Sequence, residues 1–204
     1  MTGSQVGYVD NQAVGSETER IRLNRRAWTR AGLTLLADGG VAAVRIEVLA
    51  RILGVTKGSF YWHFPDRTAL LAAMLAEWHE STTTSVVEAL WGRPHNARVK
   101  LKRLWQICFS GRVDNPGGRL ETAIRQWALH DTDIAAAVAK TDQERLAFIA
   151  DTYAELGVND SAAMARAYYH FVLGRNAVSL HTPSADPRSD LSIQRLLGIE
   201  PEGI

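Results

Sequence analysis

Apolar residues recur every three or four positions along most of the chain, and no segment alternates apolar and polar residues as a half-buried strand would. Breaks rich in Gly, Pro, Asn and Asp divide this pattern into segments. It predicts helices over about 16–38, 46–53, 56–64, 66–91, 97–112, 117–129, 132–156, 160–180 and 190–197. Residues 1–15 have neither period nor much charge, so we expect a disordered leader. The sequence therefore predicts an all-α protein of about nine helices.

Capping residues indicate where several of these helices begin. Ser16 and Glu19 have the spacing of a capping box at the start of the first helix. Thr56 is a suitable N-cap for the third helix. Pro65 breaks that helix, and Asp66 is placed to cap the next one.

Two short predicted helices, 46–53 and 56–64, are joined by only three residues, beginning with Gly54. Glycine adopts a positive φ at little cost, as a tight turn between helices often requires. Ala50 is small enough for a close crossing of the two helices. Leu49, Leu53, Val55 and Phe60 would form the small core that holds the pair together. The pattern is that of a helix-turn-helix, whose second helix enters the major groove of DNA.

The second of these helices carries five ring-bearing residues in succession, from Phe60 to Phe64. At about 100° per residue, Phe60 and Phe64 share the core-facing side. Tyr61 and His63 fall on either side of it, and Trp62 points almost directly away. An exposed tryptophan contributes little to folding, but its ring and N–H could pack on sugars and bond phosphates. The alternative is that Trp62 packs under another helix or in a dimer contact.

Charge is unevenly distributed, although the net charge is only +1. Residues 17–67 contain nine Lys and Arg against five Asp and Glu, whereas residues 68–204 contain fourteen against sixteen. A basic front section on a mildly acidic body is typical of a module that binds a polyanion. Chance clustering would produce the same imbalance, so charge alone does not decide the matter.

Composition excludes several other classes. The single cysteine, Cys108, cannot form an intrachain disulfide and suits a reducing compartment. No apolar run approaches the roughly 18 residues of a membrane span, and no secretory signal pattern is present, so we expect a cytoplasmic protein. No His, Cys or carboxylate cluster has metal-ligand spacing, and no phosphate-binding loop occurs. We expect neither a cofactor nor a metal.

The segment "LARILGVTKGSFYWHFPDRTALL" closely resembles the recognition region of the TetR family of bacterial transcriptional regulators. The resemblance is specific over residues 20–75 and extends beyond them only in architecture. It implies DNA contacts from Thr56, Lys57, Gly58, Ser59, Tyr61, Trp62, His63 and Arg67, to which we add Arg45 as a charged phosphate contact. Two positions depart from the family pattern: Arg45 stands where Ser or Thr is usual, and Glu47 stands where many members have Arg.

The same resemblance implies a domain organisation. Residues 16–65 would form the helix-turn-helix domain, and residues 66–204 a helical domain for ligand binding and dimerisation, with 66–91 as the connecting helix. The best candidates for a ligand cavity are Trp105, Phe109, Arg125, Trp127, His130, Phe148, Tyr168 and His170, although residues of this kind are more often core or surface than ligand contacts. Small and apolar side chains on helix 160–180 indicate a dimer interface with Ala163, Ala167, Phe171, Gly174 and Val178, or else an internal core helix.

The leading hypothesis is a homodimeric repressor that a small-molecule inducer releases from a palindromic DNA operator. An activator, or a regulator without a ligand, would have the same fold. An enzyme that uses Cys108 or a His–Asp pair is a remote alternative, because Cys108 lies among apolar residues where thiols are usually inert. A DNA-coating architectural protein is disfavoured by the low net charge.

Overall fold

A computed structural model describes residues 24–92, 94–109, 116–178, 195 and 197–198, without the side chains of 109, 116, 171 and 174–178. Over these residues the protein is all-helical, as the sequence predicts. Its α-helices are α2 (Arg25–Gly39), α3 (Ile46–Ile52), α4 (Lys57–Tyr61), α5 (Arg67–His79), α6 (Ser85–Trp91), α7 (Ala97–Phe109), α8 (Pro116–Ala128), α9 (Thr132–Glu155) and α10 (Ser161–Val178). A 3₁₀ turn, η1 (Val41–Ala43), precedes α3, and a π-helical turn, η2 (Glu80–Thr84), joins α5 to α6.

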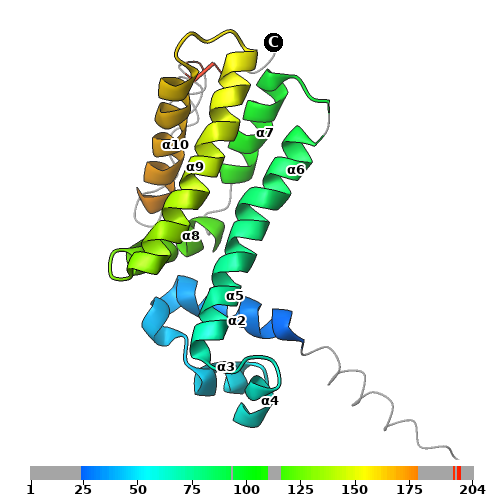
Figure 1. Ribbon diagram of the computed structural model, residues 1–204, viewed down its shortest axis with the longest axis vertical. Helices are drawn as coiled ribbons and strands as arrows, with labels where there is room; N and C mark the ends of the chain where they lie inside the picture. The colour runs from blue at the N-terminus through cyan, green and yellow to red at the C-terminus, as the bar shows by residue number, and fades with distance from the viewer. Residues whose placement is uncertain (1–23, 93, 110–115, 179–194, 196, 199–204) are drawn as a thin grey trace, which may run out of the picture.

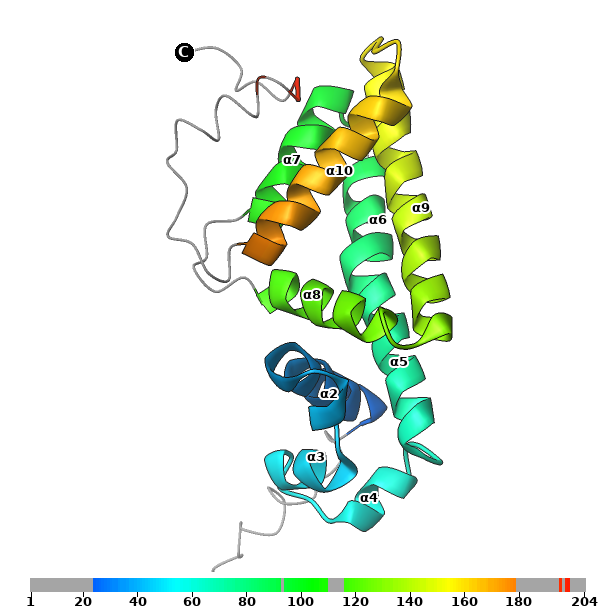
Figure 2. The same cartoon turned by 90° about the vertical axis from the view of Figure 1, so that its left-hand side faces the viewer.

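The helices form two groups joined by one long rod (Figure 1). Helices α2, α3 and α4 lie together at one end, and α7, α9 and α10 pack against α6 at the other. The rod consists of α5, η2 and α6, which follow one another without a break. Figure 2 shows α8 crossing beneath the larger group, next to α2. The predicted helix over 66–91 is therefore present, with a π-helical turn in its middle.

The helix bounds agree with the predictions within a few residues, with one exception. The first helix does not run unbroken from residue 16, because Asn24 has an extended backbone and its side chain accepts a hydrogen bond from the Ala27 N–H. Helix α2 begins after this cap. The predicted capping box at Ser16, the leader over 1–15 and most of the predicted helix over 190–197 lie outside the described residues. The predicted cap Asp66 is confirmed, since its side chain accepts the Ala69 N–H, and Asp131 caps α9 in the same way. Thr56 stands at the N-cap position of α4, but its side chain makes no capping hydrogen bond.

The hydrophobic core consists of two clusters. The first surrounds Trp28, Phe60 and Phe64 and continues without interruption into Ile124 and Trp127 of α8. The helix-turn-helix region therefore shares its core with the larger group of helices. The second cluster lies between α7, α9 and α10. None of the helices that the structure describes is long and apolar enough to cross a membrane.

The turn between α3 and α4 has the predicted geometry. Gly54 has a φ of +66°, and the N–H of Val55 donates to the carbonyl oxygen of Ala50 at 2.9 Å. A Cβ at Gly54 would meet no atom within 4 Å, so only backbone strain disfavours a side chain there.

We therefore expect Gly54→Ala to lower the free energy of unfolding by about 1–2 kcal/mol, the usual cost of a left-handed backbone for an L-residue. Gly58→Ala is the matched control on α4, where φ is not positive and the added Cβ would lie 3.7 Å from Thr56 Oγ1. This control should be neutral or stabilising by up to about 1 kcal/mol. Chemical denaturation of both variants measures the difference, and equal effects would contradict the strain argument.

Candidate nucleic-acid interface and ligand cavity

Helix α4 is held by a buried aromatic core. Phe60 and Phe64 are 0% and 1% exposed, and their rings stack with centroids 5.5 Å apart. Trp28 of α2 packs edge-on against Phe60 at 5.3 Å. Although α4 ends at Tyr61, the turn that follows keeps both phenylalanines on the same side, as the helical spacing predicts. The buried rings thus fix the orientation of α4, and the opposite side of the helix faces solvent.

The outer side of α4 exposes two large aromatic side chains. Trp62 is 89% exposed and Tyr61 is 53% exposed. Within the described part of the chain, Trp62 therefore does not pack beneath another helix. An aromatic pair this exposed, on a segment anchored by two buried rings, has the form of a contact surface.

The other predicted DNA contacts fall into three groups. Arg45, Thr56, Lys57 and Gly58 are exposed, and Ser59 and His63 are half-buried on the same segment. Arg67 is engaged inside the protein: its Nε and Nη2 donate to the carbonyl oxygens of Val44 and Val41, at 2.7 and 2.5 Å. Those bonds fix the start of α5 to the turn before α3. They leave Arg67 fewer donors for a phosphate than its sequence position suggests.

Arg25 holds the C-terminal end of the α4 segment, a role that the sequence pattern did not single out. Its Nη1 donates to the carbonyl oxygen of His63 at 3.1 Å, and its guanidinium lies 4.3 Å from the centre of the Phe64 ring. The α2 helix thereby positions the residues that follow Trp62.

Glu47, which departs from the family pattern, forms an ion pair with Lys57 across the turn, with 2.5 Å between Oε1 and Nζ. Both side chains are more than half exposed. The hydrogen bond from Lys57 lowers the pKa of Glu47, and the same bond raises the pKa of Lys57. In the free protein, the carboxylate therefore neutralises the one lysine at the start of α4.

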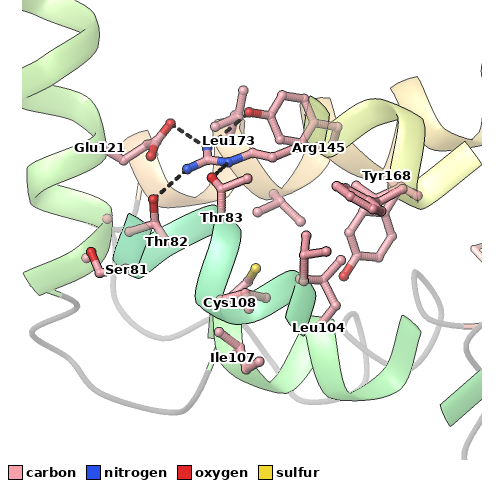
Figure 3. A pocket seen from close by; sticks show the side chains of 18 of the residues that line it. Ser81, Thr82, Thr83, Leu104, Ile107, Cys108, Glu121, Arg145, Tyr168 and Leu173 are labelled. Carbon is pink, nitrogen blue, oxygen red and sulfur yellow. Dashed lines mark hydrogen bonds and ion pairs between the residues drawn. The ribbon is translucent and has the colours of Figure 1, made fainter. Parts of the chain in front are cut away.

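A cavity of about 210 Å³ lies in the larger group of helices, between η2, α6, α7, α8, α9 and α10. Most of its lining is apolar and includes Val86, Val87, Leu104, Ile107, Phe148, Ile149, Val172 and Leu173. Figure 3 shows Thr82 and Thr83 of the π-helical turn and Glu121 of α8 gathered around Arg145 at one end. The cavity thus has an apolar body and one polar end.

Arg145 at that end makes four hydrogen bonds within the protein. Its Nε donates to Thr83 Oγ1 at 2.8 Å and its Nη2 to Thr82 Oγ1 at 2.7 Å. Its Nη1 donates to Glu121 Oε1 at 3.1 Å and to Tyr169 Oη at 3.2 Å. Burial alone would lower the pKa of Arg145, but Glu121 and Tyr169 raise it, so the guanidinium stays charged.

A second arginine, Arg125, contacts the same carboxylate of Glu121. Arg125 binds both carboxylate oxygens of Asp142, at 2.6 and 2.9 Å, and also reaches Glu121 Oε1 at 2.7 Å. The Tyr169 hydroxyl donates to Asp142 Oδ1 at 2.5 Å. Burial would raise the pKa of Asp142, yet the bonds from Arg125 and Tyr169 outweigh it and lower the pKa. Two arginines thus balance two carboxylates in one buried cluster.

The structure brings only part of the predicted ligand set to this cavity. Phe148 and Tyr168 line it. Trp105 packs edge-on against Tyr168, with ring centroids 6.2 Å apart, and Arg125 lies in the cluster behind the polar end. Trp127 belongs to the first core cluster, and His130 and His170 are exposed. The side chain of Phe109 lies outside the described part.

Sequence reasoning missed Arg145, Glu121, Thr82 and Thr83, which form the polar end. Their signal is weak, because a charged residue on an amphipathic helix is usually solvated and only the three-dimensional fold brings these four together. Among the predicted dimer residues, Ala163 is half-buried and Ala167 exposed on α10. The side chains of Phe171, Gly174 and Val178 are not described.

Comparison with known proteins decides the family. Residues 29–74, which cover most of α2 and the helix-turn-helix through the start of α5, match the sequence model of the bacterial regulatory proteins of the tetR family. This part of the chain is therefore a TetR-family domain. That family consists of regulatory proteins rather than enzymes, which argues against the remote alternative of an enzyme that uses Cys108.

Curated relatives match over this family domain. A tetracycline repressor protein of class C from Escherichia coli is 42% identical over 53 residues, which cover 26% of this chain and 24% of that protein. The nucleoid occlusion factor SlmA from Glaesserella parasuis is 31% identical over 83 residues, covering 41% of this chain and 40% of that protein. The matches thus span less than half the length of these relatives.

Solved structures extend the likeness to the whole fold. A transcriptional regulator from Rhodococcus sp. ascribed to the TetR family superposes with a TM-score of 0.64 at 24% identity, covering 89% of this chain and 96% of that one. A transcriptional regulator from Rhodococcus sp. Rha1 gives a TM-score of 0.64 at 16% identity, covering 78% and 84%. At such identities the likeness concerns the fold alone.

The Glu47–Lys57 pair leads to a prediction for the TetR-family domain. Glu47→Gln should free Lys57, tighten binding to DNA of any sequence by roughly two- to tenfold, and steepen the salt dependence by up to about one phosphate contact. Titration of duplex DNA at several salt concentrations measures both. Glu88→Gln, which removes an exposed carboxylate on α6, is the charge-matched control. Weaker binding by Glu47→Gln would mean that the pair positions Lys57 rather than neutralising it.

Cys108 lines the cavity, and burial raises the pKa of its thiol to about 12. Because only the thiolate reacts with iodoacetamide, we expect alkylation of the folded protein at pH 8 to be at least about a hundredfold slower than in denaturant. Mass spectrometry of timed samples measures the rate. Equal rates in the folded and unfolded protein would contradict the burial of this thiol.

Proposed function

We propose that this TetR-family protein is a homodimeric, sequence-specific DNA-binding regulator that represses transcription until a small molecule releases it from a palindromic operator. Residues 16–65 act as the DNA-binding domain, and residues 66–204 as the ligand-binding and dimerisation domain. The observation that carries this proposal is the exposed pair Tyr61 and Trp62 on an α4 segment fixed by buried Phe60 and Phe64.

The α4 segment contacts DNA with chemistry suited to its exposed groups. Tyr61 and Trp62 pack on sugars and bond phosphates through O–H and N–H, while Lys57 and Arg45 bring positive charge to the backbone. Ser59 reaches base edges, and Gly58 allows close approach. Thr56 and His63 complete the surface, and Arg67 contributes mainly by holding α5 in place. Sequence preference then comes from the few groups that enter the groove.

Ligand and DNA communicate through the rod of α5, η2 and α6. The rod begins next to the α4 segment, and its π-helical turn supplies Ser81, Thr82 and Thr83 to the cavity lining. A π-helical turn is a tolerant point in a helix and is often found at functional sites. A ligand that displaces this turn would redirect α5 and with it the DNA-contacting helices. A ligand shifts the balance between two conformations only if it binds one of them more tightly than the other, and contact with the π-helical turn would provide that difference.

Dimerisation through α9 and α10 presents two α4 segments to one face of DNA. Ala167 is exposed on α10, and Ala135, Ala136 and Ala139 are exposed on α9, so both helices have small residues that permit close approach. A two-fold axis between them predicts an inverted-repeat operator, with half-sites about one helical turn apart.

The direct test is a selection of random duplex DNA on the purified protein at about 150 mM salt, where binding must exceed the general attraction for phosphates. We expect a palindromic motif with two half-sites. No enrichment by folded protein would contradict sequence-specific regulation. An activator or a ligand-independent regulator would enrich the same kind of motif, and the effect of an effector on operator binding would then separate these from a repressor.

A variant series tests the contact surface. Trp62→Ala should weaken binding to the selected DNA by at least about tenfold while changing the free energy of unfolding by no more than about 0.5 kcal/mol, as for other surface substitutions. Leu129→Ala, which removes another exposed large apolar side chain (78% exposed) after α8, is the matched control and should leave DNA binding unchanged. Unchanged binding by a folded Trp62→Ala protein would remove this surface from the proposal.

A further inference from the structure

Among the residues that the structure describes, the Tyr168 hydroxyl has no hydrogen-bond partner, although the residue is only 1% exposed. Burial raises the pKa of Tyr168 well above its ordinary value, so the hydroxyl keeps its proton and remains a donor. In Figure 3 it points toward Leu104 of α7, which lines the cavity as Tyr168 itself does. The hydroxyl oxygen itself has almost no accessible surface, so an acceptor in the cavity would reach it only after a small shift of the neighbouring side chains. A buried donor left unsatisfied costs about 1–3 kcal/mol, and such a bond would recover much of that.

The charged end of the cavity offers little to an ionic ligand. Glu121 and Arg145 are the charged residues among the described lining, and they pair with each other at 3.1 Å. With its bonds to Thr82, Thr83 and Tyr169, Arg145 engages four of its five N–H groups inside the protein. A carboxylate could bind only the remaining Nη2 N–H unless it broke bonds inside the cluster, and one such bond would not offset the loss of water around the anion.

The cavity volume indicates how much of a ligand can be enclosed, although one side of the cavity is open. Its volume is about 210 Å³, whereas an apolar cavity of about 150 Å³ accepts a single benzene ring. The space therefore exceeds one six-membered ring and suits two fused rings or an equivalent hydrocarbon.

From these observations we infer that the effector is an uncharged, largely apolar molecule of about two fused rings, with a hydrogen-bond acceptor such as a carbonyl placed to receive the Tyr168 O–H. This inference rests on the proposed function, whose effector it describes. Binding to the cavity can nevertheless be measured without DNA, so the two proposals fail separately.

Three probes of nearly one shape test the inference: 2-acetonaphthone, which has a neutral acceptor, 2-naphthoate, which is its anionic counterpart, and 2-ethylnaphthalene, which has no acceptor. Equilibrium dialysis against the full chain measures their affinities. We expect 2-acetonaphthone to bind at least about tenfold more tightly than 2-naphthoate, because the anion would lose its hydration. Equal or tighter binding of 2-naphthoate would overturn the inference, as would failure of both neutral probes to bind.

The role of Tyr168 is tested with Tyr168→Phe, which keeps the ring and removes the donor. It should reduce affinity for 2-acetonaphthone by roughly threefold to tenfold, the range of one neutral hydrogen bond, and leave 2-ethylnaphthalene within about twofold. Tyr153→Phe is the matched control: Tyr153 is equally buried, does not line the cavity, and donates to the Leu197 carbonyl oxygen at 2.9 Å. Identical behaviour of the two variants toward 2-acetonaphthone would overturn the assignment of Tyr168.

Folding of the variant is checked by thermal denaturation. Because Tyr168→Phe removes an unpaired buried hydroxyl, it should not lower the melting temperature. If the neutral probes bind as expected but random DNA yields no motif, the cavity inference stands and the regulator proposal falls. A clear DNA motif with no neutral-probe binding would support the regulator proposal and overturn the cavity inference.

Discussion

The largely buried guanidinium of Arg145 constrains how the helices around the cavity pack. A charge in the interior is tolerated only when its partners are close and well oriented. Arg145 meets that requirement with the π-helical turn through Thr82 and Thr83, and with α8 through Glu121. The π-helical turn, α8 and α9, which carries Arg145, must therefore keep their relative positions for the charge to have its partners. The cavity next to Arg145 exists within that arrangement.

This constraint connects the cavity to the DNA-contacting end. Glu121 also accepts the indole N–H of Trp78 on α5 at 3.1 Å, and α8 continues the core that surrounds Trp28 and Phe60. In the proposed mechanism, a change at the polar end of the cavity would be transmitted both along the rod and through the packed core. Interfaces of this kind change between discrete arrangements rather than deforming gradually. The fold therefore provides a physical route by which a ligand in the cavity would regulate the helix-turn-helix domain.

Much of the local structure could be predicted from the sequence, and the ligand site could not. Helix periods, the Gly54 turn and the opposite faces of Phe60 and Trp62 depend on neighbours along the chain, and the structure agrees with them. The break at Asn24 was missed because the capping box at Ser16 suggested an earlier start. Arg67 and Arg145 depend on partners 23 or more positions away, which no local pattern reveals. For the same reason, His130 and His170 looked suitable for a cavity but are exposed.

The central claim is that occupancy of the cavity and binding of DNA are coupled. Linkage requires that the coupling be reciprocal, and typical factors are about 5 to 150. The most direct test measures affinity for the selected operator with and without saturating 2-acetonaphthone, and affinity for 2-acetonaphthone with and without operator. The account predicts that each ligand weakens the other by the same factor. A factor of one in both directions, with both ligands bound, would contradict it.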